Sequence, residues 1–269
     1  MKHFRIFFLL FLFLFQGPLL FSQKFNKEAS IDIESKLAKL DQFGNIYVVQ
    51  PNNELIKFSS KGVKLWSYSN KNFGDIDQVD VKDPLRILVF YAAHQQIVIL
   101  NNNLSEINRY SFNKDPDVQI TLVASANNNG YWVYDQLNRE LKKLSNTFID
   151  ELRSGNIYQR DGLDIKANYL YANDAYVFIN DKGEGIRIFD RFGNFYKTAV
   201  IEIPREFEVE GSQILFGKER KLYAYDFLSF QLVSLEIPNV ENATNFIKYL
   251  NHLLIIGEKQ LTLWSLKND

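Results

Sequence analysis

The chain has 269 residues, of which 46% are hydrophobic and 15% aromatic, and its formal net charge is −1. This composition suits one large β domain with much packed sheet surface, and the lack of a basic surplus argues against nucleic-acid binding. The chain has no cysteine, which excludes disulfides, thiolate metal sites, a cysteine nucleophile and lipid attachment through cysteine.

Residues 1–22 have the pattern of a secretory signal peptide. Lys2 and Arg5 form a charged start, an unbroken apolar run extends over residues 6–15, and Gln16-Gly17-Pro18 interrupts it. A transmembrane helix needs about 20 apolar residues, so the run favours a cleaved leader over the alternative of a retained anchor. We therefore expect residues 23–269 to form an exported domain that does not itself span the membrane.

Residues 40–69 contain three short strands joined by two tight turns. Residues 45–50 alternate and are rich in β-branched and aromatic side chains, and Pro51-Asn52-Asn53 is typical of a turn. A second strand is expected at residues 55–58, and a third follows the turn at residues 59–62. This is the pattern of one nearly complete blade of a β-propeller.

A short apolar strand that ends in a large residue recurs about every 40 residues, which is typical of a repeat architecture. Its six copies are residues 55–58, 97–100, 141–144, 186–189, 222–225 and 261–264. A more apolar strand precedes each copy, as expected for positions buried between neighbouring blades. An innermost strand is expected before that, at residues 36–40, 76–81, 120–124, 163–169, 207–210 and 246–250. The fold class predicted is all-β, a six-bladed propeller of four-stranded antiparallel blades.

The sixth blade lacks an outer strand, because the chain ends five residues after Trp264. An open strand row invites aggregation, and closure of the ring removes it. Residues 29–33 alternate in apolar character and are not needed elsewhere. We therefore predict that this N-terminal strand closes the last blade.

Residues 176–195, YVFINDKGEGIRIFDRFGNF, resemble the NHL-type repeat of six-bladed propellers through Asp181 in the turn, residues 186–190, and Gly193 before an aromatic residue. Residues 44–62, in the first expected blade, are similar but match this repeat more loosely. The resemblance implies the fold across the mature chain. It carries no activity, because this fold hosts lyases, lactonases, sensors and scaffolds.

Catalytic and metal-binding patterns are weak. Some NHL-type lyases hold zinc with several histidines, whereas only His94 and His252 remain here outside the leader. Lactonase-like relatives hold a divalent ion with carboxylates and amides. This chain has four acidic pairs that fit turns equally well, namely Asp75/Asp77, Asp80/Asp83, Asp115/Asp117 and Asp181/Glu184. There is no nucleophile elbow and no phosphate-binding loop. We therefore assign no catalytic, cofactor-binding or metal-binding residue.

The connection over residues 158–176 is rich in aromatic and charged side chains. Tyr169 and Tyr171 suit stacking against a partner or a sugar, and Arg160 and Asp161 suit its orientation. The alternative is that the tyrosines are strand residues that pack between blades. His94 and Arg139 add planar donors in turns on the same expected face, where second and third strands are joined.

These observations favour an exported, non-catalytic propeller scaffold in the periplasm or at the outer membrane, with a protein partner such as an outer-membrane secretion or uptake channel. No cofactor and no nucleic acid is expected. The partner-binding candidates are His94, Arg139, Arg160, Asp161, Tyr169 and Tyr171. The alternative is a small-ligand binder, or a divalent-cation-dependent hydrolase or lyase, acting at the central channel.

Overall fold

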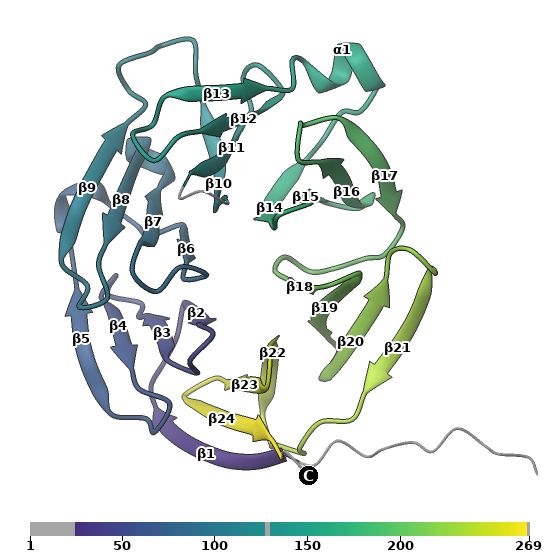
Figure 1. The fold of residues 1–269 in the computed structure, drawn as a ribbon. Coiled ribbons are helices and arrows are strands. Elements are labelled where there is room, and N and C mark those ends of the chain that lie inside the picture. Colours follow the sequence, from purple (N-terminus) through teal and green to yellow (C-terminus); the bar gives the residue numbers. More distant parts are fainter. Residues whose placement is uncertain (1–24, 127–129, 268–269) are drawn as a thin grey trace, which may run out of the picture.

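The computed structural model describes residues 25–126 and 130–267. Within these ranges the strands form six four-stranded antiparallel sheets that surround a central axis as the blades of a propeller (Figure 1). The predicted all-β, six-bladed architecture is therefore confirmed. The expected signal peptide at residues 1–22 lies outside the described residues.

The first three blades follow the chain without interruption, and each runs from an inner to an outer strand. Blade 1 contains β2 (Leu37–Leu40), β3 (Ile46–Val49), β4 (Leu55–Phe58) and β5 (Lys64–Tyr68). Blade 2 contains β6 (Gln78–Asp80), β7 (Ile87–Tyr91), β8 (Gln96–Leu100) and β9 (Glu106–Ser111). Blade 3 contains β10 (Ile120–Ser125), β11 (Tyr131–Asp135), β12 (Glu140–Leu144) and β13 (Asp150–Arg153).

The last three blades repeat this order, except that the two ends of the chain share blade 6. Blade 4 contains β14 (Ala167–Ala172), β15 (Tyr176–Asp181), β16 (Gly185–Asp190) and β17 (Phe195–Ala199). Blade 5 contains β18 (Glu208–Glu210), β19 (Gln213–Lys218), β20 (Lys221–Asp226) and β21 (Gln231–Leu235). Blade 6 contains β22 (Ala243–Tyr249), β23 (His252–Gly257), β24 (Gln260–Leu266) and β1 (Phe25–Asp32).

The core consists of apolar wedges between neighbouring blades. The second strands β3 and β7 are buried at every position, because each lies between two adjoining sheets. One cluster joins Leu55 of blade 1 to Val89 of blade 2, and another joins Phe178 of blade 4 to Phe227 of blade 5. Burial on both faces explains why these strands are almost continuously apolar in the sequence.

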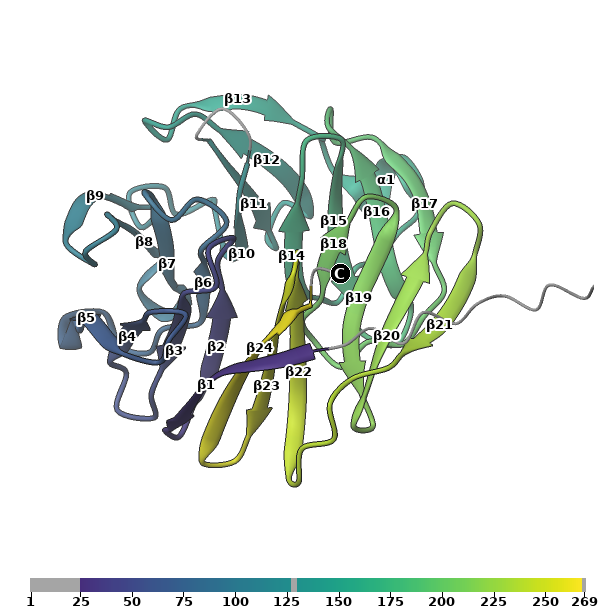
Figure 2. The same cartoon turned by 60° about the horizontal axis from the view of Figure 1, so that its bottom comes forward.

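Strand β1 closes the ring, as predicted. It pairs antiparallel with β24, with Ala29 opposite Leu263 and Ile31 opposite Leu261, and Figure 2 shows the two strands side by side. Ala29 and Ile31 are buried in the core cluster between blades 6 and 1. The N-terminal strand therefore supplies both the missing ladder and part of a core wedge.

The turns between third and fourth strands pack against the preceding blade. In blade 3, Phe148 has a left-handed φ of 63°, yet it is buried and stacks on Tyr110 of blade 2 at 4.7 Å. Leu104 holds the corresponding place in blade 2 and is also left-handed and buried. Glycine takes this place in blade 1, where Gly62 lies against Ala29, so a left-handed conformation costs little there.

One connection departs from the expectation. An inner strand was expected at residues 163–169, but residues 157–161 form the short helix α1 (Ile157–Asp161) and the inner strand β14 is shifted to Ala167–Ala172. Asn156 begins the helix by accepting a hydrogen bond from the Gln159 N–H at 2.9 Å, and Gly162 ends it in a left-handed conformation. No helix within the described residues is long and apolar enough to cross a membrane.

Candidate functional site

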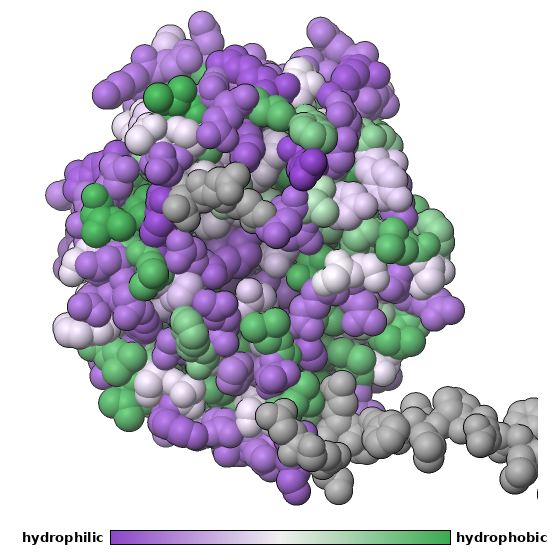
Figure 3. All heavy atoms as spheres, in the orientation of Figure 1, coloured by the Kyte–Doolittle hydropathy of each residue, from purple (hydrophilic) through white to green (hydrophobic). Residues whose placement is uncertain are grey.

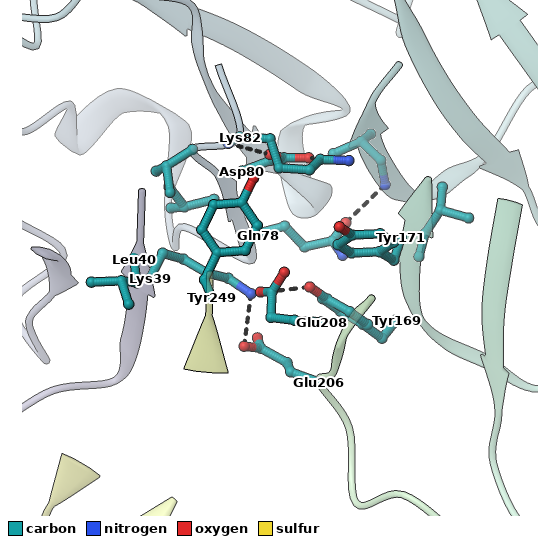
Figure 4. A pocket seen from close by; sticks show the side chains of 14 residues that line it. Lys39, Leu40, Gln78, Asp80, Lys82, Tyr169, Tyr171, Glu206, Glu208 and Tyr249 are labelled. Atoms are coloured by element: carbon teal, nitrogen blue, oxygen red, sulfur yellow. Dashed lines mark hydrogen bonds and ion pairs between the residues drawn. The ribbon is translucent and has the colours of Figure 1, made fainter. Parts of the chain in front are cut away.

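The innermost strands of the six blades lie around the axis of the ring (Figure 1), and we call the region into which their side chains project the central channel. Figure 4 shows charged and tyrosine side chains from several of these strands converging on one small cavity in the channel. The charged residues of its lining are Lys39, Asp80, Lys82, Glu206 and Glu208. Charges at this depth need partners, so the contacts of each group determine what the channel can do.

Lys39, in β2, is the centre of the first group of contacts. Its ammonium group donates hydrogen bonds to Glu206 at 2.8 Å and to the Tyr169 hydroxyl at 3.1 Å. Burial lowers the pKa of Lys39, but the neighbouring Glu206, Tyr169 and Glu208 outweigh it and hold that pKa well above the usual value. Lys39 is therefore a fixed cation that joins blade 1 to blades 4 and 5.

Glu208, in β18, lies beside this group (Figure 4). Burial raises its pKa to about 7. The carboxylates of Asp80 and Glu206 act in the same direction, whereas Lys39 and Lys82 oppose them. Glu208 is therefore a channel carboxyl with a pKa close to neutral pH.

Lys82 is the centre of a second group, on the blade 2 side. It donates hydrogen bonds to the Ser125 carbonyl at 3.0 Å and to the Ala172 carbonyl at 2.5 Å. Asp80 lies 3.6 Å from Lys82 and accepts the Ser125 N–H at 2.8 Å. Lys82 and Asp80 thus join the inner strands of blades 2, 3 and 4.

Further side-chain contacts join different blades at the two ends of the channel. At the end where the blade connections lie, Arg205 donates a hydrogen bond of 3.3 Å to the Asp77 carbonyl of blade 2. At the other end, Lys248 of blade 6 pairs with Glu210 of blade 5 at 2.9 Å. Arg205 therefore spans the channel at one end, whereas Lys248 and Glu210 join neighbouring blades at the other.

The cavity that remains has a volume of about 30 Å³. That volume holds about two water molecules, so this cavity has no room for an organic substrate. Its carboxylates are mostly occupied by lysines and backbone N–H groups. The charged side chains of the channel therefore connect the inner strands of different blades to one another.

The residues considered for metal binding are dispersed. Among residues 25–126 and 130–267, no group of three or more His, Asp or Glu side chains is arranged to hold a metal ion. His94 ends the turn η2 (Ala92–His94) in blade 2, beside Phe73, whereas His252 lies in β23 of blade 6. The two histidines therefore belong to separate parts of the ring.

The acidic pairs act within turns and ion pairs. Asp77 accepts the Ala92 N–H at 2.7 Å, and Asp115 accepts the Asp117 N–H at 3.0 Å. Asp181 is fully buried and accepts a hydrogen bond from Arg187 at 2.8 Å. Asp80 is the member of these pairs that lies in the channel.

Arg139, Arg160 and Asp161 come together at the connection between blades 3 and 4. The guanidinium of Arg139 lies 4.9 Å from the ring centroid of Tyr158, in α1. Arg160 is fully engaged: it donates to the Ser154 carbonyl at 2.6 Å, to the Gly193 carbonyl at 3.0 Å and to Asp161 at 2.7 Å. Arg160 therefore fastens α1 to the edges of both blades, whereas Arg139 keeps an exposed surface.

Tyr169 and Tyr171 are not on the surface. Both are buried in β14 and line the channel cavity, with the Lys82 ammonium 4.5 Å from the Tyr171 ring centroid. Both are strand residues that pack between blades, which is the alternative given above, and the shift of the inner strand to residues 167–172 is what brings Tyr171 into it. The structure therefore separates the two tyrosines from Arg160 and Asp161.

The sequence contained a signal for the channel cluster that the motif search missed. The inner strands carry a charged residue at an otherwise apolar position, as in LAKL at Leu37–Leu40 and FEVE at residues 207–210. A buried position in a predicted strand rarely holds Lys or Glu unless a partner is present. Such positions point to the channel, but they do not show which residues meet there.

No family model and no curated protein matches this sequence. Among solved structures, the Pan2 WD40 domain of Neurospora crassa is similar over 92% of this chain and 97% of its own, with a TM-score of 0.58 and 9% identity. Virginiamycin B lyase from Staphylococcus aureus is similar over 86% and 80%, with a TM-score of 0.53 and 10% identity. BBS1N in complex with ARL6DN is similar over 91% and 98%, with a TM-score of 0.55 and 14% identity. At these identities the likeness shows the propeller fold alone.

Proposed function

We propose that this chain is an exported propeller scaffold that binds a protein partner at the cell envelope and does not catalyse a reaction. The observation that supports this most strongly is the bridged channel, in which Lys39 and Lys82 engage the groups that a channel-mouth enzyme would use. A scaffold of this kind acts through its outer surface, which the propeller holds rigid. The leader-like pattern at residues 1–22 supports export, and a partner in an outer-membrane assembly fits that compartment.

The face that carries the blade connections offers a surface suited to such a partner. Leu137, in the turn between β11 and β12, is 56% exposed, and Tyr158 is 49% exposed. Arg139 lies over the Tyr158 ring, and Leu137 lies two positions before Arg139 in the same turn. Protein interfaces concentrate their binding energy in aromatic and arginine side chains of this kind. We name Leu137, Arg139 and Tyr158 the loop-face cluster.

Similar folds support both classes of function. A structure similar to this chain holds BBS1N together with ARL6DN, so a propeller of this shape accommodates a protein partner. Another is a lyase with quinupristin bound, so the fold alone does not favour binding over catalysis. The alternative, a cation-dependent enzyme at the channel, requires Asp80 and Glu206 to leave their lysine partners.

Purification of the native chain from detergent-solubilised envelope tests the proposal. We expect a protein partner in a fixed stoichiometric ratio, and we expect the Tyr158→Ala, Arg139→Ala double variant to recover at least about tenfold less of it, or about 1.4 kcal/mol. His94→Ala, on the same face but in blade 2, measures how far the contact extends. A chain that elutes alone, and that binds calcium or zinc stoichiometrically in calorimetry, would support the enzyme alternative instead.

A further inference from the structure

The outer edge of blade 5 differs from the other outer edges of the ring. Strand β21 (Gln231–Leu235) reads QLVSL and has no charged residue, and four of its five positions are exposed. The outer strands of the other blades carry charges, for example Glu106 and Arg109 in β9 and Lys64 in β5. Charged residues on an edge strand protect it against pairing with another chain, and β21 lacks this protection.

The turn that leads into β21 contains an unusual exposed aromatic residue. Phe230 has a left-handed φ of 62° and its side chain is 63% exposed. Leu104 and Phe148 have the same conformation in the corresponding turns of blades 2 and 3, but their side chains are buried against the preceding blade. In blade 5 that inward place is taken by Phe227, which is buried among the aromatic residues of blade 4. Packing within the ring therefore does not explain Phe230.

A cation lies against Phe230. The ammonium group of Lys197, in β17, is 4.8 Å from the Phe230 ring centroid and 5.0 Å from that of Tyr196. It also donates a hydrogen bond to the Phe227 carbonyl. Within the described ranges, its polar contact is this carbonyl, and no acidic side chain forms an ion pair with it. Lys197 is thus a cation available to an acidic group from outside the chain.

These side chains share one side of the blade. Leu232 pairs with Tyr225, whose ring belongs to the core between blades 4 and 5, so Leu232 and Phe230 point toward blade 4. Tyr196, Phe230 and Leu232 are each about half exposed or more. In Figure 3 hydrophobic side chains occur along the edge where Figure 1 places β17 and β21. We name Tyr196, Lys197, Phe230 and Leu232 the rim patch.

We propose that β21 and the rim patch bind an extended, acidic and apolar segment of a partner protein by strand addition. The segment's backbone pairs with the open edge of β21, its apolar side chains contact Phe230 and Leu232, and a carboxylate pairs with Lys197. This inference rests on the proposed scaffold function, but it concerns a surface separate from the loop-face cluster. A left-handed aromatic residue whose side chain is largely exposed is the kind of backbone strain that is found at binding sites.

Three substitutions separate binding from folding. Phe230→Gly removes the ring and relaxes the left-handed turn, so it should leave the thermal midpoint unchanged or raise it. Lys197→Met keeps a long apolar chain and removes the charge. Val233→Lys puts a charge on the edge of β21, and Leu65→Lys in β5 is its matched control on the edge of blade 1.

A displayed library of random heptapeptides, selected on the purified chain, tests the inference without knowledge of the partner. We expect enrichment of segments that alternate apolar residues with Asp or Glu and lack a central proline. Enriched peptides, measured by fluorescence anisotropy, should bind at least about tenfold more weakly to the Phe230→Gly and Val233→Lys variants, and equally well to Leu65→Lys. Lys197→Met should remove the preference for acidic over basic peptides.

The inference is overturned if no peptide is enriched, if basic or proline-rich peptides are enriched, or if the enriched peptides bind Phe230→Gly as tightly as the unsubstituted chain. If the chain nevertheless co-purifies with a stoichiometric partner from the envelope, the scaffold function stands and this surface is refuted. If peptides bind as expected but no envelope partner is recovered, the surface stands and the envelope assignment fails.

Discussion

The ammonium group of Lys39 lies 2.8 Å from the carboxylate of Glu206, although 167 positions separate the two residues in the sequence. The side chains of this pair are only 8% and 17% exposed. The pair fastens the inner strand of blade 1 to the chain that enters blade 5, across the axis of the ring. Its burial makes it a structural element whose loss is measurable.

We predict that Lys39→Met lowers the free energy of unfolding by about 3 kcal/mol, because removal of one partner leaves a buried carboxylate uncompensated. Equilibrium urea denaturation measures this. The control is Lys61→Met, which removes a pair with Glu28 in which Lys61 is 71% exposed. A surface pair of that kind contributes about 0–1 kcal/mol. Equal effects of the two substitutions would show that the channel pair is not structural.

Glu208 should make the stability of the fold depend on pH. Burial raises its pKa from 4.5 to about 7, so between these values the folded chain holds a proton that the unfolded chain has released. The free energy of unfolding should therefore fall as the pH rises through this interval, and the total loss should be about 3 kcal/mol. The Glu208→Gln variant should lose this dependence.

The measurement is the urea midpoint of both chains between pH 5 and pH 8. The control, Glu202→Gln, removes a carboxylate that is 80% exposed and whose pKa is lowered by its hydrogen bond to Lys218. That control should keep the decline in stability with rising pH. If the stability of the Glu208→Gln variant declines with rising pH as much as that of the unsubstituted chain, other groups cause the decline.

Closure of blade 6 by β1 should be required for stability. A chain that begins at residue 33 lacks the ladder to β24 and the buried side chains of Ala29 and Ile31. We expect it to be less stable by several kcal/mol than a chain that begins at residue 23, because the truncation exposes a strand edge and part of a core wedge. Identical thermal midpoints for the two chains would contradict the closure model.

Arg139 and Arg160 should behave differently when each is replaced by alanine. Arg160 donates to the Ser154 and Gly193 carbonyls, so Arg160→Ala should lower the free energy of unfolding by about 2 kcal/mol. Arg139 is exposed above Tyr158, so Arg139→Ala should change stability by less than about 0.5 kcal/mol and act on partner recovery. Calorimetric melting of the two variants checks this. Loss of stability in Arg139→Ala would make that residue structural as well.

A chelator should leave the thermal midpoint unchanged. Lys39 and Lys82 act as counterions for the channel carboxylates, so the fold does not depend on a bound metal ion for their charge. A tightly bound structural ion would appear as a loss of several degrees on chelation, by mass action. Melting with and without chelator, followed by addition of calcium or zinc, makes the comparison.

The sequence predicted the fold because local and repeated patterns determine it. Apolar strands such as Ile46–Val49 and Ile87–Tyr91 are buried on both faces, and their continuous apolar character revealed them at their full extent. Closure by β1 was also predictable, since blade 6 had no outer strand of its own. Helix α1 depended on one capping residue and one terminal glycine, which is too short a signal to fix the start of β14.

The channel cluster was not predictable in the same way. Lys39 meets Tyr169 and Glu206, and these residues come from three blades that local sequence cannot bring together. Their contact follows only from the closed ring and its blade order. Tyr171 shows the consequence, because a shift of a few residues in one inner strand moves it from an expected connection to the channel wall.

We propose that this propeller acts through its outer surface and not through its channel. The most direct measurement is the ratio of partner to chain recovered from detergent-solubilised envelope, compared among the unsubstituted chain, a channel variant and a surface variant. We expect Glu208→Gln to leave this ratio unchanged and the Arg139→Ala, Tyr158→Ala variant to lower it by about tenfold or more. A ratio of zero for the unsubstituted chain, or a ratio that falls with Glu208→Gln and not with the surface variant, would contradict the proposal.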